Sequence, residues 1–291
     1  MSTTTALRHP WNTDFEWVDH AGPFGAITPA QAEAFDRDGF FVVEDVLDAD
    51  VVAAVTAELD AFEAESERFL QSQEGGRFHI AEAGAISFVP HLAARSAVLA
   101  DLARHPRLVG ICADLVGPDV NLYWDQAVYK KPEKPRRFPW HQDNGYTFVE
   151  PQAYLTCWIA LTDATIDNGC PQVTPGVHRS GTLRHRYVEP LGWECFSDPP
   201  DVVAAPVGAG GAVVFSSLTP HLTGPNTTTA VRKAYILQYA PAGAVALRGD
   251  PAAGAPNRRD RQDDPHSQFG VVRSGRPCSR DDHQGADDDH A

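Results

Sequence analysis

Two residues near the middle of the chain, His141 and Asp143, have side chains that can bind a divalent metal. In an extended segment, residues two apart point to the same side, so the imidazole and the carboxylate would share one face. The pair would then supply two of the three ligands that a protein gives to a reactive metal. A His-x-Asp tripeptide is common, however, and by itself it more often serves packing or a surface hydrogen bond.

A third ligand has to come from another part of the chain, and His221 is the best candidate. It follows the apolar segment Ala212–Ser216 and a turn at Thr219 and Pro220, which predicts a place at a strand edge. Two histidines and one carboxylate on one face of an octahedron leave three positions open, which suits a non-haem iron(II) oxygenase. His178 is a competing distal ligand, but it lies in a turn and lacks a following arginine at a suitable spacing, because Arg184 and Arg186 sit in a polar run.

The open positions at such a metal can take a chelating co-substrate, and the chain offers an anchor for one. In 2-oxoglutarate the keto acid end chelates iron, while the far carboxylate lies deeper in the protein. Arg232 follows His221 by eleven residues and opens the apolar segment Ala234–Tyr239. Its planar guanidinium group can pair with both oxygens of a carboxylate. Thr223 could add a hydroxyl donor to the same carboxylate.

The elements that must position these residues change character along the chain. The first part predicts helices: one that begins after the N-cap Thr28 and ends at Gly39, one from Asp48 through Phe62, and one over about residues 96–116. After Gly117 the pattern favours short strands separated by Gly- and Pro-rich turns. The expected strands are Phe40–Val43, Asn121–Tyr129, Ala153–Leu161, Ala212–Ser216 and Ala234–Tyr239. The chain is therefore expected to be α+β, with a β sandwich or barrel as its core.

The length of the chain fits one large domain or two small ones. The 291 residues, 43% of them hydrophobic, can bury a core without disulfides or a structural metal. We expect an arm over residues 1–26, a single domain over residues 27–249, and a polar, largely flexible tail over residues 250–291. Within that tail, Gln268–Gly275 could still add a strand.

Charge and cysteine content exclude several classes of function. With 24 basic and 39 acidic residues the net charge is −15, so the chain is a poor candidate for binding nucleic acid or an anionic membrane. We find neither an apolar stretch of the ~20 residues that a membrane helix needs nor a signal peptide. The five cysteines are widely spaced, which favours reduced thiols in a cytoplasmic protein.

Taken together, these motifs resemble the phytanoyl-CoA dioxygenase family of iron(II)/2-oxoglutarate oxygenases over roughly residues 28–245. Besides His221 and Arg232, the segments that carry the resemblance are Phe35–Val43, His141–Asp143, Leu155–Leu161, Asn168–Cys170 and Pro175–Arg179. The resemblance implies a double-stranded β-helix, a jelly roll of two sheets with helices packed outside. It also implies a dioxygenase that hydroxylates or otherwise oxidises a C–H bond of a small or mid-sized metabolite, using dioxygen and releasing succinate and CO2.

The resemblance further assigns roles residue by residue. The iron(II) ligands would be His141, Asp143 and His221, and the residues around 2-oxoglutarate would be Arg232, Thr223, Trp158 and, by a looser match, Gln126. A carboxylate at position 143 argues against a halogenase, whose members have a small residue there. Two alternatives remain: a non-catalytic jelly-roll binding protein, and a cupin-like metal enzyme that does not use 2-oxoglutarate.

Three groups of residues near the predicted site have a structural and a functional interpretation. The first is a basic run that is either a solvated loop or a guide for an anionic substrate: Lys130, Lys131, Lys134, Arg136 and Arg137. The second is a set of aromatic residues around the His-x-Asp pair that either line a substrate site or pack in the core: Trp140, Tyr146 and Phe148. The third is a later insert, with Trp193 and Phe196, that could form a lid.

Overall fold

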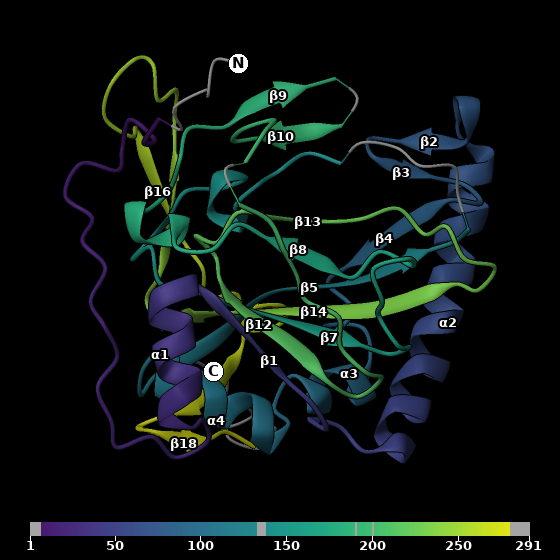
Figure 1. The fold of residues 1–291 in the computed structure, drawn as a ribbon, viewed down its shortest axis with the longest axis horizontal. Coiled ribbons are helices and arrows are strands. Elements are labelled where there is room, and N and C mark those ends of the chain that lie inside the picture. The colour runs from purple at the N-terminus through teal and green to yellow at the C-terminus, as the bar shows by residue number, and fades with distance from the viewer. Residues whose placement is uncertain (1–6, 133–137, 190, 200, 280–291) are drawn as a thin grey trace, which may run out of the picture.

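A computed structural model describes residues 7–132, 138–189, 191–199 and 201–279 of the chain (Figure 1). Its four α-helices are α1 (Pro29–Asp38), α2 (Ala49–Ser72), α3 (Ala97–Leu102) and α4 (Pro106–Leu115). Three short 3-10 turns lie at Glu74–Gly76 (η1), Asp143–Gly145 (η2) and Val177–Ser180 (η3). None of the helices in the described residues is long and apolar enough to cross a membrane.

The helix ends follow local chemistry, with one correction to the prediction. Thr28 caps α1 by accepting a hydrogen bond from the backbone N–H of Gln31, and Gly39 ends the helix with a left-handed φ of 85°. The single helix predicted over about residues 96–116 is wrong, because two helices are present. Pro106 starts the second one, since a proline fits the first turn of a helix but not its interior.

The largest sheet is antiparallel and runs in the order β1-β12-β7-β14-β5-β4-β3-β2. In that order the strands are Phe40–Val43, Ala212–Ser216, Leu155–Ala160, Arg232–Pro241, Val120–Lys130, Ile86–Pro90, Ala81–Glu82 and Arg77–Phe78. At the start of β5 this sheet also takes up β17 (Gly270–Arg273), which pairs with β18 (Arg276–Pro277). The predicted strands are thus present, and they lie side by side in the largest sheet.

Three small sheets complete the β structure. The first is β11-β8-β13, formed by Val203–Ala204, Pro171–Val173 and His221–Thr223. The second is β16-β15-β6, formed by Arg258–Arg261, Val245–Arg248 and Val149–Glu150. The third is the hairpin of β9 (Arg186–Val188) and β10 (Gly192–Glu194).

The two faces of the main sheet bury different partners. On β14, Tyr235 and Leu237 belong to the large core that the helices cover, whereas Ala234 and Ile236 point to the opposite side and join a second cluster. This alternation is what a strand buried on both faces requires. Figure 1 shows α2, α3 and α4 outside the main sheet and β8 and β13 across from it. The prediction of a jelly roll with flanking helices is confirmed.

The polar segment after residue 250 is more ordered than predicted. It contributes β16, β17 and β18, and β17 pairs with β5. Phe269, Val271 and Val272 are buried in the large core, which explains the order despite the polar composition around them. The expectation of a largely flexible tail over residues 250–291 is therefore wrong up to residue 279, and residues 280–291 lie outside the described residues.

Candidate active site

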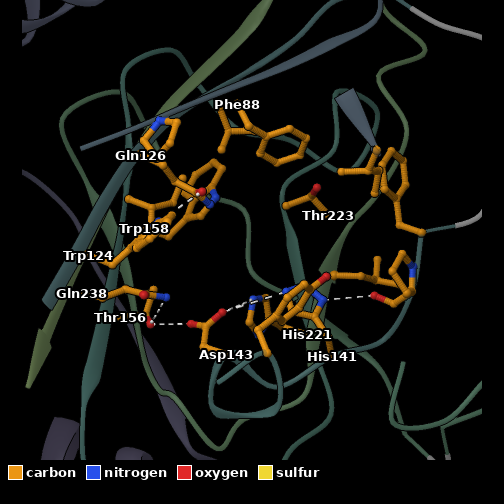
Figure 2. A pocket seen from close by; sticks show the side chains of 18 of the residues that line it. Phe88, Trp124, Gln126, His141, Asp143, Thr156, Trp158, His221, Thr223 and Gln238 are labelled. Atoms are coloured by element: carbon orange, nitrogen blue, oxygen red, sulfur yellow. Dashed lines mark hydrogen bonds and ion pairs between the residues drawn. The ribbon is translucent and has the colours of Figure 1, made fainter. Parts of the chain in front are cut away.

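His141, Asp143 and His221 come together at one point, as the sequence predicted (Figure 2). His141 and His221 face each other across an antiparallel bridge, with backbone N–H to carbonyl distances of 3.1 and 2.9 Å. Asp143 lies two residues after His141 and opens η2. One possible ligand atom from each of the three residues lies within 4.8 Å of the other two.

Hydrogen bonds to the backbone orient both imidazoles. Nδ1 of His141 lies 3.1 Å from the carbonyl oxygen of Pro139, and Nδ1 of His221 lies 3.0 Å from that of Thr219. With Nδ1–H donating in each ring, Nε2 keeps its lone pair and faces Asp143 Oδ1, at 3.9 and 3.7 Å. Burial, helped by the nearby His221, holds the pKa of His141 well below its usual range, so this ring is neutral, as a metal ligand must be.

The second carboxylate oxygen of Asp143 is held by the main sheet. The Thr156 hydroxyl on β7 donates to Oδ2 at 2.6 Å, and Gln238 on β14 donates through Nε2 to Thr156 Oγ1 at 3.4 Å. These contacts leave Oδ1 directed at the imidazoles, and such outer partners tune the ligands of many metal sites. The sequence reasoning missed both residues, although Thr156 is in phase with Trp158 along the same strand.

The loop between the first two ligands is fixed by buried contacts. The Gln142 side chain donates to the carbonyl oxygen of Gly181 at 3.1 Å and accepts from the backbone N–H of Leu183 at 2.6 Å. His185 Nε2 accepts the backbone N–H of Gln142 at 2.9 Å. Burial lowers the pKa of His185 to about 4, so the ring is neutral and able to accept. A Cβ at Gly145 would come within 2.0 Å of this ring, so only glycine fits there.

The residues predicted around the co-substrate lie along the same sheet face. Arg232 is fully buried at the start of β14, and its Cζ lies 5.0 Å from the centroid of the Trp158 ring. Arg232 is in phase with Ile236 and Gln238, which line the cavity above the metal ligands. Trp158 also lines this cavity.

Thr223 and Gln126 occupy different walls of the cavity (Figure 2). Thr223 is on β13, two residues after His221, and its Oγ1 accepts a hydrogen bond from Lys130 Nζ at 3.2 Å. Gln126 is on β5, and its Oε1 accepts from Trp124 Nε1 at 3.3 Å.

Lys130 corrects the interpretation of the basic run. It is fully buried at the end of β5, is paired in register with Arg232, and donates to the carbonyl oxygen of Gly224 at 2.5 Å. Strand periodicity could have revealed this, because Lys130 is in phase with Gln126 and Val128. Lys131 forms ion pairs with two residues of α2, its Nζ lying 2.9 Å from a carboxylate oxygen of Glu63 and 2.7 Å from one of Glu67. The remaining members, Lys134, Arg136 and Arg137, lie outside the described residues.

The other candidate residues near the site divide into those that line the cavity and those that do not. His178 is buried against α1, with Nε2 at 3.1 Å from the carbonyl oxygen of Asp36, and is not part of the His-Asp-His cluster. Tyr146 lines the cavity, with its ring centroid 5.2 Å from that of His141. Trp193 on β10 is exposed. The remaining aromatic residues of these groups pack in the core, namely Trp140, Phe148 and Phe196.

Fold and site together define a class of protein. Two imidazoles and one carboxylate lie on one side of a cavity of about 590 Å³ within a jelly roll. This is the ligand set of non-haem iron(II) oxygenases, in which three metal positions stay open for other ligands. The donor set fits iron(II), and the buried Arg232 fits the far carboxylate of a dicarboxylic co-substrate.

The chain belongs to the phytanoyl-CoA dioxygenase (PhyH) family, whose model matches residues 35–234. It is 34% identical over 179 residues to the ectoine dioxygenase of Sphingopyxis alaskensis, and this match covers 57% of this chain and 53% of that protein. The chain thus spans about half the length of this curated relative.

Solved structures give the same assignment. The carbocyclase SnoK from nogalamycin biosynthesis, described as non-haem and α-ketoglutarate-dependent, has a TM-score of 0.63 and 25% identity. That match covers 84% of this chain and 98% of SnoK. EvdO2 from Micromonospora carbonacea var. aurantiaca, crystallised with 2-oxoglutarate, has a TM-score of 0.59 and 26% identity, with 78% of this chain and 95% of EvdO2 covered.

Proposed function

We propose that this chain is an iron(II)- and 2-oxoglutarate-dependent dioxygenase that hydroxylates, or otherwise oxidises, a C–H bond of a small or mid-sized metabolite. The observation that carries the proposal is the convergence of His141, Asp143 and His221 at one cavity wall. Bound iron would supply the activation of dioxygen, coupled to conversion of 2-oxoglutarate to succinate and CO2.

Each protein group then has a defined task around the metal. His141 and His221 would hold iron through Nε2, and Asp143 would hold it through Oδ1, because Thr156 binds the other oxygen. Oriented in advance, these groups need no rearrangement when the metal binds. The cavity that these three residues line would receive co-substrate, dioxygen and substrate.

The co-substrate lies along the same sheet face. Arg232 would pair with its far carboxylate through two of its three guanidinium nitrogens. Because Thr223 Oγ1 accepts from Lys130, its own hydroxyl hydrogen is left to donate to that carboxylate. Trp158 stacks against Arg232 and walls the co-substrate, and Gln126 contacts it from β5.

We further propose a small molecule and dioxygen as partners, with no role for nucleic acid. Asp143 favours hydroxylation or another oxidative step over halogenation, because its carboxylate fills the position that a halide would need. The cytoplasm is the proposed compartment, because all five cysteines are free thiols.

The test is anaerobic addition of iron(II) and then 2-oxoglutarate, followed by the weak visible charge-transfer band of the chelated complex. The band should form in wild type and be absent in His221→Ala. His178→Ala serves as the matched control, since His178 lies outside the cluster, and it should keep the band. Loss of the band in His178→Ala alone would exchange the two histidine assignments.

The anaerobic titration, followed by an aerobic assay of succinate release, separates the two alternatives. A cupin-like metal enzyme without 2-oxoglutarate would bind metal, but its metal spectrum would not respond to 2-oxoglutarate. A non-catalytic binding protein would release no succinate with any substrate. Either result in wild type would overturn the proposal.

A further inference from the structure

We propose that the substrate is an uncharged, ring-containing molecule larger than an amino acid, held by aromatic side chains across the cavity from the metal ligands. This inference rests on the proposed function, because it assigns the space that co-substrate and metal leave. It names a substrate class rather than one compound.

The size of the cavity gives the first argument. Its volume is about 590 Å³, within the ~300–1,000 Å³ range of small-molecule sites. A water molecule occupies about 30 Å³ in the liquid. At that volume for each of its ten non-hydrogen atoms, 2-oxoglutarate would fill roughly 300 Å³. About as much space therefore remains for the substrate, and tighter packing of the co-substrate would leave more.

The charge of the walls gives the second argument. Among the lining residues that the structure describes, Asp143 is the sole carboxylate, and neither lysine nor arginine occurs. In the proposed function Arg232 is taken up by the co-substrate carboxylate, and Lys130 donates to Thr223 and Gly224. A phosphate, carboxylate or ammonium group on the substrate would lose water here without gaining an opposite charge. An acyl-CoA or a zwitterion therefore fits poorly.

The third argument is the aromatic wall itself. Phe88 on β4 and Trp124 on β5 are half-buried and lie across the cavity from His141 and Asp143 (Figure 2). The His91 ring packs edge-on against Trp124, with centroids 4.3 Å apart, and so limits the movement of the indole. Aromatic faces held in this way stack on flat rings and gain more than area burial alone gives. A rigid ring system also loses less rotamer freedom on binding than a flexible chain does.

Aromatic surface continues out of the cavity. Tyr146 lines it and is 48% exposed, which places this residue at the mouth. A Cβ on Gly192 of β10 would lie 3.2 Å from the Tyr146 hydroxyl, so the β9–β10 hairpin borders the mouth. On that hairpin the exposed rings of Tyr187 and Trp193 pack edge to face, with centroids 5.7 Å apart. The part of a bound ligand that extends out of the cavity would contact these two rings.

The experiment uses N-phenyl-1-naphthylamine, an uncharged aromatic dye that fluoresces in apolar sites. It is titrated under nitrogen into protein loaded with iron(II) and 2-oxoglutarate. Three competitors follow at equal concentration: naringenin, which is neutral and ring-based, ectoine, a zwitterion, and octanoyl-CoA, an anionic thioester. We expect the dye to bind and naringenin to displace it, whereas ectoine and octanoyl-CoA leave it in place.

Variants locate the dye. Trp124→Ala should raise the dye's Kd about tenfold, which corresponds to about 1.4 kcal/mol. Trp124→Phe, which keeps a ring, should restore most of the affinity. Trp17→Ala is the matched control, because Trp17 is also half-buried but packs against Phe35 and His178 away from this cavity. It should leave the Kd unchanged.

The outcomes distinguish this inference from the proposed function. If the iron–2-oxoglutarate band forms but the dye does not bind, the substrate class is wrong and the oxygenase assignment stands. Equal effects of Trp124→Ala and Trp17→Ala, or better displacement by ectoine or octanoyl-CoA, would also overturn the substrate class. Absence of the band itself would count against the proposed function.

Discussion

Replacement of Thr156 by valine should weaken metal binding without disturbing the fold. The Thr156 hydroxyl donates to Asp143 Oδ2 at 2.6 Å, and the threonine side chain is buried. Valine keeps the shape and removes the donor. The carboxylate would then be free to rotate, and its other oxygen would no longer be held toward the imidazoles.

Two independent magnitudes bound the size of this effect. A hydrogen bond to a charged group contributes about 1.5–3 kcal/mol. Loss of an outer partner of a metal ligand typically costs about 10–100-fold in metal affinity, which corresponds to about 1.4–2.8 kcal/mol. The ranges overlap, so we expect Thr156→Val to raise the Kd for iron(II) by about 10–100-fold.

The assay is anaerobic competition for iron(II) with a colorimetric chelator, with thermal unfolding of the metal-free protein run alongside. Thr156→Ser, which restores a hydroxyl, should recover most of the affinity. Thr174→Val is the matched control, because Thr174 is fully buried and its hydroxyl has no hydrogen-bond partner among the described residues. Wild-type metal affinity in Thr156→Val would refute the idea that this hydroxyl orients Asp143.

Three further predictions concern residues around the site. His185→Ala removes the acceptor for the Gln142 N–H and should weaken iron(II) binding about tenfold in the chelator assay. An unchanged Kd would mean that the loop between His141 and Asp143 keeps its conformation without His185. Lys130→Met should raise the Kd for 2-oxoglutarate, because Thr223 loses the donor that orients it, while iron(II) affinity stays at the wild-type value; titration of the charge-transfer band measures both. Burial lowers the pKa of His178 to about 4, so below pH 6.5 only the unfolded state takes up this proton, and the free energy of unfolding falls as the pH drops toward 4, by up to about 1.4 kcal/mol per pH unit. His178→Gln should flatten this dependence in denaturant titrations, and an identical slope in the variant would contradict the assignment.

The residues whose placement could be predicted are those tied to a local rule. His141 and Asp143 share a face because they are two apart in an extended segment, and the register of the bridge then brings His221 to them. Arg232 was placed by its position at the start of an apolar strand. Turn residues and apolar runs were enough to locate the main strands.

The features that were missed depend on pairing between distant strands. The phase of Thr156 with Trp158 indicates its sheet face, but its contact with Asp143 depends on how β7 and η2 pack together. Lys130 was grouped with its charged neighbours, as part of a solvated loop or a guide for an anionic substrate, although it is in phase with the buried Val128. A strand was expected within Gln268–Gly275, where β17 lies, but β16 was missed because its four residues, Arg258–Arg261, are all charged.

The ligand cluster also joins two separate parts of the jelly roll. His221 belongs to the small sheet β11-β8-β13, whereas Asp143 is fastened through Thr156 to β7 of the main sheet. A shared ion would fasten one sheet to the other, and the unfolded chain has no equivalent site. At an ion concentration a hundredfold above Kd, this linkage adds about 2.7 kcal/mol to the free energy of unfolding. The melting temperature of this protein should therefore report its metal occupancy, and a shortage of iron would lower the amount of folded protein as well as the proposed activity.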